Sequence, residues 1–235
     1  MKEKRKIRVL VVDYHKLGLE NTWEDLLPLL SESEREKVGR FKFEADRIRS
    51  IVGICLIKSA VYRAFPGEEV KLETTMEGKP HIANRSGFEF NLSHSGRIIA
   101  LAEDSYPVGV DVELVKDKDW KIFHRYLSDD EMTMIESAKD PEACFFEVWT
   151  VREAFSKEEG LGLKILDSDF TVDYSKREIN YSGKKLYFYS FDHTADDRYK
   201  LSICSAKEVA EPEISFLSTE DWERCLREGL FSEIK

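Results

Sequence analysis

Two acidic segments that lie far apart in the chain carry its strongest chemical signal. Apolar residues alternate with other types through 108–114, which places Asp111 and Glu113 together on one face of a strand. Glu153 and Lys157 stand four residues apart in a helix-like segment, and residues at that spacing are neighbours on a helix. Mg²⁺ favours carboxylates together with substrate phosphates. We therefore predict a magnesium site at Asp111, Glu113 and Glu153, with the choice between Mg²⁺ and Mn²⁺ left open.

Each part of this signal also has an ordinary structural interpretation. A Glu/Lys pair on a helix is often a surface ion pair that contributes little to stability. Two acids on one face of a strand are often a solvated sheet edge. The sequence has no His/Cys cluster that would offer zinc as an alternative metal. The two acidic segments favour a metal site only in combination.

A segment rich in hydrogen-bond donors precedes the first acidic strand. Residues 91–97 join two predicted strands and include Ser93, His94 and Arg97, whose side chains suit a phosphate group. The alternative is a polar hairpin whose side chains bond to their own backbone. Lys79, just before Pro80, is interpreted either as a second phosphate contact or as a turn residue.

Basic residues gather near the start of a long apolar helix predicted at 43–65, at Arg35, Lys37, Arg40, Arg47 and Arg49. Most of them are expected to face water. Arg49 and Ser50 are the residues placed to reach inward from the first turns of that helix.

Composition excludes several classes of protein. The chain has 235 residues, enough for one large domain or two small ones, and a net charge of −10, which argues against general nucleic-acid binding. Its four cysteines are widely separated, as expected for reduced thiols. The sequence shows no signal-peptide core and no membrane-spanning stretch, so we predict a cytoplasmic protein without membrane association.

Local patterns predict an α+β protein with two similar halves. Strands are expected at 7–14, 70–74, 88–93, 98–102, 108–114, 170–174, 178–181, 186–191 and 199–205. Helices are expected at 21–30, 31–40, 43–65, 118–127, 129–138, 141–159 and 219–228. Two capping boxes mark helix starts, Ser31 with Glu34 and Ser128 with Glu131. Each half places helices before an antiparallel group of strands, and we predict domains at 1–114 and 115–235.

Several motifs occur in order and at fitting separations. They are Gly78-Lys-Pro80, Phe90-Asn-Leu-Ser-His-Ser-Gly96, Gly109-Val-Asp-Val-Glu113 and Trp149-Thr-Val-Arg-Glu-Ala-Phe-Ser-Lys157. From about Arg40 to Leu163 the chain thereby resembles the 4′-phosphopantetheinyl transferase superfamily, in its longer, surfactin-synthetase-activating (Sfp-like) branch. The chain departs from the family pattern at Arg152, where many members have Lys, and at Glu34, where a Lys is expected.

The resemblance implies a pseudo-dimer in which each half is an antiparallel sheet packed on a long helix. Coenzyme A and Mg²⁺ would bind between the halves, with Asp111, Glu113 and Glu153 as metal ligands. Glu153 and Lys157 would be the catalytic residues, with a metal-bound water or His94 as the other candidate bases. Contacts to coenzyme A are expected from Lys37, Arg49, Lys79, Pro80, Ser93, His94 and Arg97.

The resemblance also implies the reaction and the partners. The enzyme would transfer 4′-phosphopantetheine from coenzyme A to a serine of an apo acyl or peptidyl carrier protein, in secondary metabolism, and act as a monomer. Two alternatives stay open at this point. One is a metal-dependent phosphodiesterase, and the other is a non-catalytic module that binds coenzyme A or a carrier protein.

Overall fold

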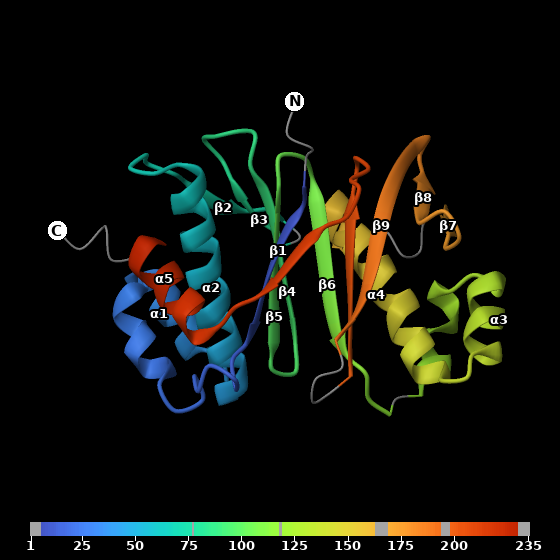
Figure 1. Cartoon of the computed structure of the whole chain (residues 1–235), viewed down its shortest axis with the longest axis horizontal. Coiled ribbons are helices and arrows are strands. Elements are labelled where there is room, and N and C mark those ends of the chain that lie inside the picture. The colour runs from blue at the N-terminus through green and yellow to red at the C-terminus, as the bar shows by residue number, and fades with distance from the viewer. Residues whose placement is uncertain (1–5, 77, 118, 163–168, 194–197, 230–235) are drawn as a thin grey trace.

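The computed structural model describes residues 6–76, 78–117, 119–162, 169–193 and 198–229, and there the chain forms two main sheets (Figure 1). Leu163 at the end of the resemblance and residue 118 at the start of a predicted helix lie outside these ranges. The first sheet has the order β11 (Glu213–Phe216), β1 (Arg8–Asp13), β5 (Ile98–Asp104), β4 (Glu89–Ser95). The second has the order β6 (Val108–Leu114), β10 (Tyr199–Ser205), β9 (Lys184–His193), β8 (Glu178–Tyr181), β7 (Phe170–Asp173). A small hairpin pairs β2 (Leu72–Thr74) with β3 (Pro80–Ile82).

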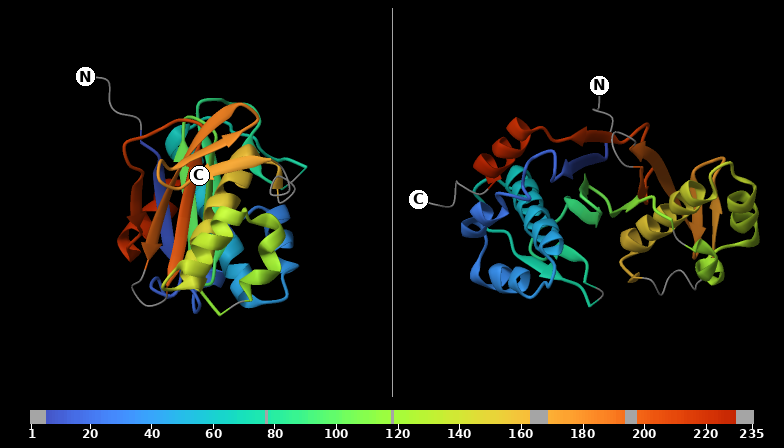
Figure 2. Two further views of the ribbon diagram at one scale, coloured as in Figure 1. Left: turned by 90° about the vertical axis from the view of Figure 1, so that its right-hand side faces the viewer. Right: turned by 90° about the horizontal axis from the view of Figure 1, so that it is seen from below.

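One long helix lies against each main sheet. Helix α2 (Glu44–Ala64) covers the first sheet and α4 (Pro141–Glu159) the second, on opposite sides of the central strands (Figures 1 and 2). Smaller helices are α1 (Glu32–Gly39), α3 (Asp129–Ser137) and α5 (Thr219–Gly229). Both predicted capping boxes are present, at the starts of α1 and α3. The predicted α+β pseudo-dimer, with an antiparallel sheet on a long helix in each half, is confirmed, although β11 joins β1 in parallel.

Two predicted helices are short 3₁₀ segments instead, η1 (Trp23–Leu29) and η2 (Trp120–Tyr126). In η1, Pro28 has no backbone N–H to donate within an α-helix, which favours the short irregular form. No helix in the described part of the chain is both long and apolar enough to span a membrane.

Burial on both faces of the central strands joins the two halves. On β1, Leu10 and Val12 pack in the core under α2, whereas Val9 and Val11 pack in a separate core between the two sheets. That inter-sheet core also contains Val110 of β6. Because both faces are covered, β1 is a continuous apolar run rather than an alternating one.

A polar contact joins the edge strands β4 and β6 of the two sheets. Alternate side chains of β4 accept hydrogen bonds from alternate backbone N–H groups of β6. These bonds run from Val110 to Asn91 (2.9 Å), from Val112 to Ser93 (3.3 Å) and from Leu114 to Ser95 (3.2 Å). We call this set of three bonds the polar ladder. It fixes the register of the two acidic residues of β6 against β4.

The sheets divide the chain differently from the predicted boundary between residues 114 and 115. Strand β6 lies before that boundary but belongs to the second sheet. Strand β11 and helix α5 lie after it but pack on the first half, where β11 pairs with β1 and α5 contacts α2. The change from the first sheet to the second falls between β5 and β6.

A close approach of α4 to β6 explains the glycine that precedes the acids of β6. A Cβ at Gly109 would lie 1.9 Å from the carbonyl oxygen of Ala154 and 2.5 Å from the backbone nitrogen of Glu158. Both of those atoms belong to the backbone of α4, so a side chain at Gly109 could enter only if the helix moved. The glycine therefore sets the distance between the strand and the helix that carry the acids.

We expect Gly109→Ala to lower the free energy of unfolding by about 3 kcal/mol, because overpacking against backbone cannot be relieved by a change of rotamer. Urea denaturation would measure this loss. Gly39→Ala is the matched control, since nothing lies within 4 Å of a Cβ at the end of α1. Equal stability of the two variants would contradict the close approach.

Candidate active site

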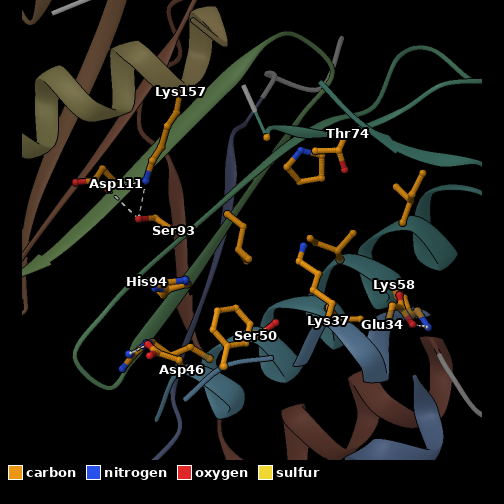
Figure 3. A pocket seen from close by; sticks show the side chains of 18 of the residues that line it. Glu34, Lys37, Asp46, Ser50, Lys58, Thr74, Ser93, His94, Asp111 and Lys157 are labelled. Atoms are coloured by element: carbon orange, nitrogen blue, oxygen red, sulfur yellow. Dashed lines mark hydrogen bonds and ion pairs between the residues drawn. The ribbon is translucent and has the colours of Figure 1, made fainter. Parts of the chain in front are cut away.

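A cleft of about 590 Å³ lies where the two halves meet, and most of the predicted site residues line it (Figure 3). The second half contributes Asp111 and Glu113 from β6 and Glu153 and Lys157 from α4. The first half contributes residues of both charges and several apolar side chains. The predicted residues that line it from the first half are Lys37, Arg49, Pro80, Ser93 and His94.

Lys157, Asp111 and Ser93 form a closed hydrogen-bonded group (Figure 3). The Lys157 ammonium donates to Asp111 Oδ1 at 2.7 Å and to Ser93 Oγ at 2.9 Å. The Ser93 hydroxyl donates to Asp111 Oδ1 at 2.8 Å and also accepts the Val112 N–H of the polar ladder. A hydroxyl has one donor and two acceptor positions, so these bonds use the full capacity of Ser93.

The second acid of β6 is held in the same way as the first. The Ser95 hydroxyl donates to Glu113 Oε2 at 2.7 Å, next to the bond that it accepts from Leu114 in the polar ladder. Burial raises the pKa of Glu113, and the bond from Ser95 partly offsets this shift. Ser95 was not among the predicted site residues, although it lies on the same strand face as Ser93.

The third acid, Glu153, is strongly perturbed. Its pKa is raised to about 7, first by burial and then by the charges of Asp111 and Glu113, while Lys157 lowers it. The three carboxylates, which come from two distant segments, therefore lie close enough to repel one another. A carboxyl group with a pKa near neutrality can exchange a proton at working pH.

One atom of this group fits a bound cation. Asp111 Oδ2 is buried and has no hydrogen-bond partner, and a buried carboxylate oxygen normally has one. Carboxylate oxygens are the ligands that Mg²⁺ prefers. In the described ranges no three His, Cys, Asp or Glu side chains already converge closely enough to enclose an ion, and the Lys157 ammonium neutralises Asp111 instead.

The first half contributes basic side chains to the same cleft. Arg49 on α2 donates to the carbonyl oxygen of Gly96 at 2.7 Å and pairs with Asp46. His94 follows Ser93 on β4, and desolvation in the cleft and the Arg49 charge lower its pKa. Lys37 projects into the cleft from the end of α1, near Glu34 and Lys58 (Figure 3).

Glu34, an acid in the wall of the first half, is neutralised by Lys58, which was not among the predicted site residues. Glu34 accepts a hydrogen bond from Lys58 of α2 at 2.8 Å, and Lys58 also donates to the carbonyl oxygen of Leu29 at 3.1 Å. The Glu34 carboxylate therefore adds no net negative charge to the cleft. Ser50, which was expected to reach inward, does line the cleft, and spacing could have revealed the rest of this face, since Ile54, Ile57 and Lys58 follow it at helical intervals.

Two residues predicted to contact coenzyme A do not line the cleft. Arg97 donates to Asp13 Oδ2 at 2.9 Å, within the first half. Lys79 reaches across to backbone carbonyls at the end of α4. Their phosphate contacts therefore stay predictions.

Arg152 points away from the cleft into the second half. Its guanidinium makes a two-pronged ion pair with Glu131 of α3, with both partners buried, and Tyr174 donates to the same carboxylate at 2.8 Å. The planar fork of Arg suits this bond better than a Lys ammonium would. The pair ties α4 to α3 and so fixes the rotation of the helix that presents Glu153.

Comparisons with known proteins match the two halves separately. The model described as 4′-phosphopantetheinyl transferase, N-terminal, matches residues 18–106, and that of the 4′-phosphopantetheinyl transferase superfamily matches residues 107–204. The junction coincides with the turn between β5 and β6, where the chain passes from one sheet to the other.

Curated relatives extend the similarity over most of the chain. It is 32% identical to 4′-phosphopantetheinyl transferase psf-1 of Bacillus pumilus, over 84% of this chain and 88% of that protein. It is 30% identical to 4′-phosphopantetheinyl transferase Sfp of Bacillus subtilis, over 84% and 92%. A human L-aminoadipate-semialdehyde dehydrogenase-phosphopantetheinyl transferase is 29% identical over 57% of this chain and 49% of its own length.

Fold, cleft and comparisons agree on the class of protein. The chain belongs to the 4′-phosphopantetheinyl transferase superfamily. Within it, similarity to psf-1 and Sfp over most of both lengths places the chain in the longer, Sfp-like branch. The comparisons give no support to a phosphodiesterase or to a non-catalytic module.

In the absence of metal, the free energy of unfolding of the wild-type protein should fall relative to that of the Glu153→Gln variant as the pH rises from 5 to 8. The pKa of Glu153 is about 7 in the fold against an ordinary value of 4.5, so the unfolded chain loses this proton first. Rising pH through that interval then favours unfolding, by about 2 kcal/mol in total. Urea denaturation in EDTA at several pH values would measure it. A difference between the variants that does not change with pH would contradict the raised pKa.

Proposed function

We propose that this enzyme transfers 4′-phosphopantetheine from coenzyme A to a serine hydroxyl of an apo carrier protein. The other product is adenosine 3′,5′-bisphosphate. The observation that carries the proposal is the cleft itself, which brings three mutually repelling acids and a lysine of the second half together with basic side chains of the first half. Such a cleft suits a substrate with phosphates at two positions and a reaction that needs a metal.

The basic side chains of the first half are proposed to hold the nucleotide phosphates. Lys37, Arg49 and His94 can each donate to phosphate oxygens, and Pro80 lines the wall nearby. An arriving phosphate could compete with Asp46 for the Arg49 guanidinium. Ser93 is proposed to act through Lys157 and Asp111, because its hydroxyl is already saturated.

Asp111, Glu113 and Glu153 are proposed as the ligands of a magnesium ion, and the partnerless oxygen of Asp111 supports this. Bound Mg²⁺ would offset the negative charge of the pyrophosphate and of the leaving phosphate. Lys157 then serves a second purpose, since its ammonium can leave Asp111 and contact a phosphate oxygen. Catalysis of phosphoryl transfer rests mainly on such positioning and charge.

Glu153 is proposed as the base that accepts the proton of the attacking serine. In the metal-free protein its pKa is about 7, and a carboxyl group that titrates near neutrality can accept a proton, directly or through a metal-bound water. Lys157 lowers that pKa, so the lysine helps the carboxyl group to be ionised before the reaction. His94 lies next to Ser93 on β4 and near Arg49, and it is proposed as a phosphate ligand rather than as the base.

The chain is also proposed to act as a monomer with pseudo-twofold symmetry, in the cytoplasm. Both walls of the cleft come from one chain, which supports function without a second copy. With a net charge of −10, long-range attraction to an acidic carrier protein is not expected. Docking through apolar contacts near the cleft is proposed instead.

Intact-mass measurement of apo carrier proteins after incubation with coenzyme A and Mg²⁺ tests the reaction. A gain of one phosphopantetheine by the carrier supports the proposal. Hydrolysis of coenzyme A with no change in the carrier would support a phosphodiesterase, and binding of coenzyme A without either reaction would contradict an enzyme.

Asp111→Asn should lower the rate of transfer at least ~100-fold, because it removes one preorganised charge from the site. Turnover of coenzyme A and apo carrier in Mg²⁺ would measure the loss. Asp25→Asn on the exposed side of η1 is the control for a general effect of removing a carboxylate. Near-normal turnover by Asp111→Asn would exclude Asp111 as a metal ligand.

Binding of adenosine 3′,5′-bisphosphate in EDTA should take up about half a proton more near pH 6.5 in wild type than in His94→Asn. The pKa of His94 is lowered in the free protein, and a phosphate beside it would raise that pKa. Calorimetry in buffers of different ionisation enthalpy would measure the uptake. His124→Asn, at an exposed position, should behave as wild type. Equal uptake in all three proteins would place the phosphate elsewhere.

A further inference from the structure

Lys79 belongs to the first half but contacts the second. It stands at the end of the β2–β3 hairpin, where Thr75 N–H donates to its carbonyl at 2.9 Å and its own N–H donates to Thr75 Oγ1 at 3.1 Å. Its ammonium donates to the carbonyl oxygen of Lys157 at 2.7 Å and to that of Glu158 at 3.1 Å. Both carbonyls lie in the last turn of α4.

The end of α4 needs such a partner. The last carbonyls of an α-helix have no N–H group ahead of them, and they form the negative end of the helix dipole. Gly160 ends the helix in the left-handed conformation, and a Cβ there would lie 3.7 Å from Lys79 Cδ. The lysine stem therefore passes over the glycine and delivers a positive charge to two of these carbonyls.

The contact from Lys79 holds the backbone of Lys157, whose side chain lies in the cleft. The backbone of Lys157 accepts from Lys79, while its side chain donates to Asp111 and Ser93. The last turn is also pressed against β6, where Gly109 leaves room for Glu158. One side of this turn is thus fixed by packing within the second half, and the other by a cation from the first half.

The buried surroundings of Lys79 disfavour the positive charge of its ammonium group. Burial lowers its pKa, and the carboxylates of Glu158 and Glu89 offset only part of that effect. Lys79 does not line the main cleft. It lines a separate cavity of about 180 Å³ beside that cleft. An ammonium turned toward carbonyls is not available to a phosphate in the same arrangement.

We propose that Lys79 is a positioning residue that holds the last turn of α4 across the junction of the halves, so that Lys157 reaches the reacting phosphate. This inference rests on the proposed function of the cleft. It differs from the expectation that Lys79 itself binds coenzyme A. The residue acts on turnover through Lys157, and on substrate affinity only weakly.

Kinetics of Lys79→Met with coenzyme A and with 3′-dephospho-coenzyme A test this role. We expect kcat to fall about 10- to 100-fold, because a small displacement of a catalytic group is costly. We expect KM for coenzyme A to stay within about threefold of wild type and the preference for coenzyme A over its dephospho form to be unchanged. Lys79→Arg should recover at least half of the lost log kcat, since its guanidinium can also donate to carbonyls.

Lys37→Met is the matched control, because it removes a lysine that lines the cleft. This variant should raise KM for coenzyme A about tenfold and leave kcat nearly unchanged. A Lys79→Met variant that behaves like Lys37→Met would overturn the positioning role and show a substrate contact. An unchanged kcat in Lys79→Met would also overturn it.

Amide hydrogen exchange keeps the inference testable without any activity. Exchange at residues 157–161 should be about tenfold faster in Lys79→Met than in wild type, with the rest of α4 unchanged. Unaltered exchange at this turn would contradict the contact. If the wild-type protein transferred no phosphopantetheine, the proposed function would be contradicted. The exchange measurement would still test, independently, whether Lys79 holds the last turn of α4.

Discussion

The polar ladder between β4 and β6 is the constraint on which the site depends. Two sheet edges meet there without a continuous backbone ladder, and three short side chains accept the N–H groups that β6 would otherwise leave unpaired. Ser93 and Ser95 use the same hydroxyls to hold Asp111 and Glu113. The same two hydroxyls therefore help both to join the halves, beside the apolar core between the sheets, and to orient the acids.

Charge in the cleft is balanced locally rather than across the whole protein. Asp111 is neutralised by Lys157, and Glu34 by Lys58. Among the described residues Glu153 has no hydrogen-bonded cation of this kind, and its pKa is raised to about 7. A proton relieves the repulsion on Glu153 and a metal ion would do the same, which agrees with the roles of metal ligand and base proposed for it.

Much of the fold could be predicted from local pattern. The bounds of α4 agree with the pattern that starts at Pro141 and ends before Gly160, since proline and glycine fix the two ends. Strand β11 was not predicted, because four residues that pair with β1 across most of the chain leave little local signal. The acids were found because period-two spacing fixes a strand face. The direction of the Lys79 side chain could not be predicted, because the residue type specifies its charge but not which half of the molecule it reaches.

The return of β11 and α5 to the first half has a consequence for biosynthesis. The first sheet lacks one edge strand, and α2 lacks its covering helix with Trp222, until the whole of the second half has been translated. The second half is in effect an insertion within the first. A nascent chain can therefore complete its later lobe before its earlier one, and truncation near residue 210 would damage the half that is made first.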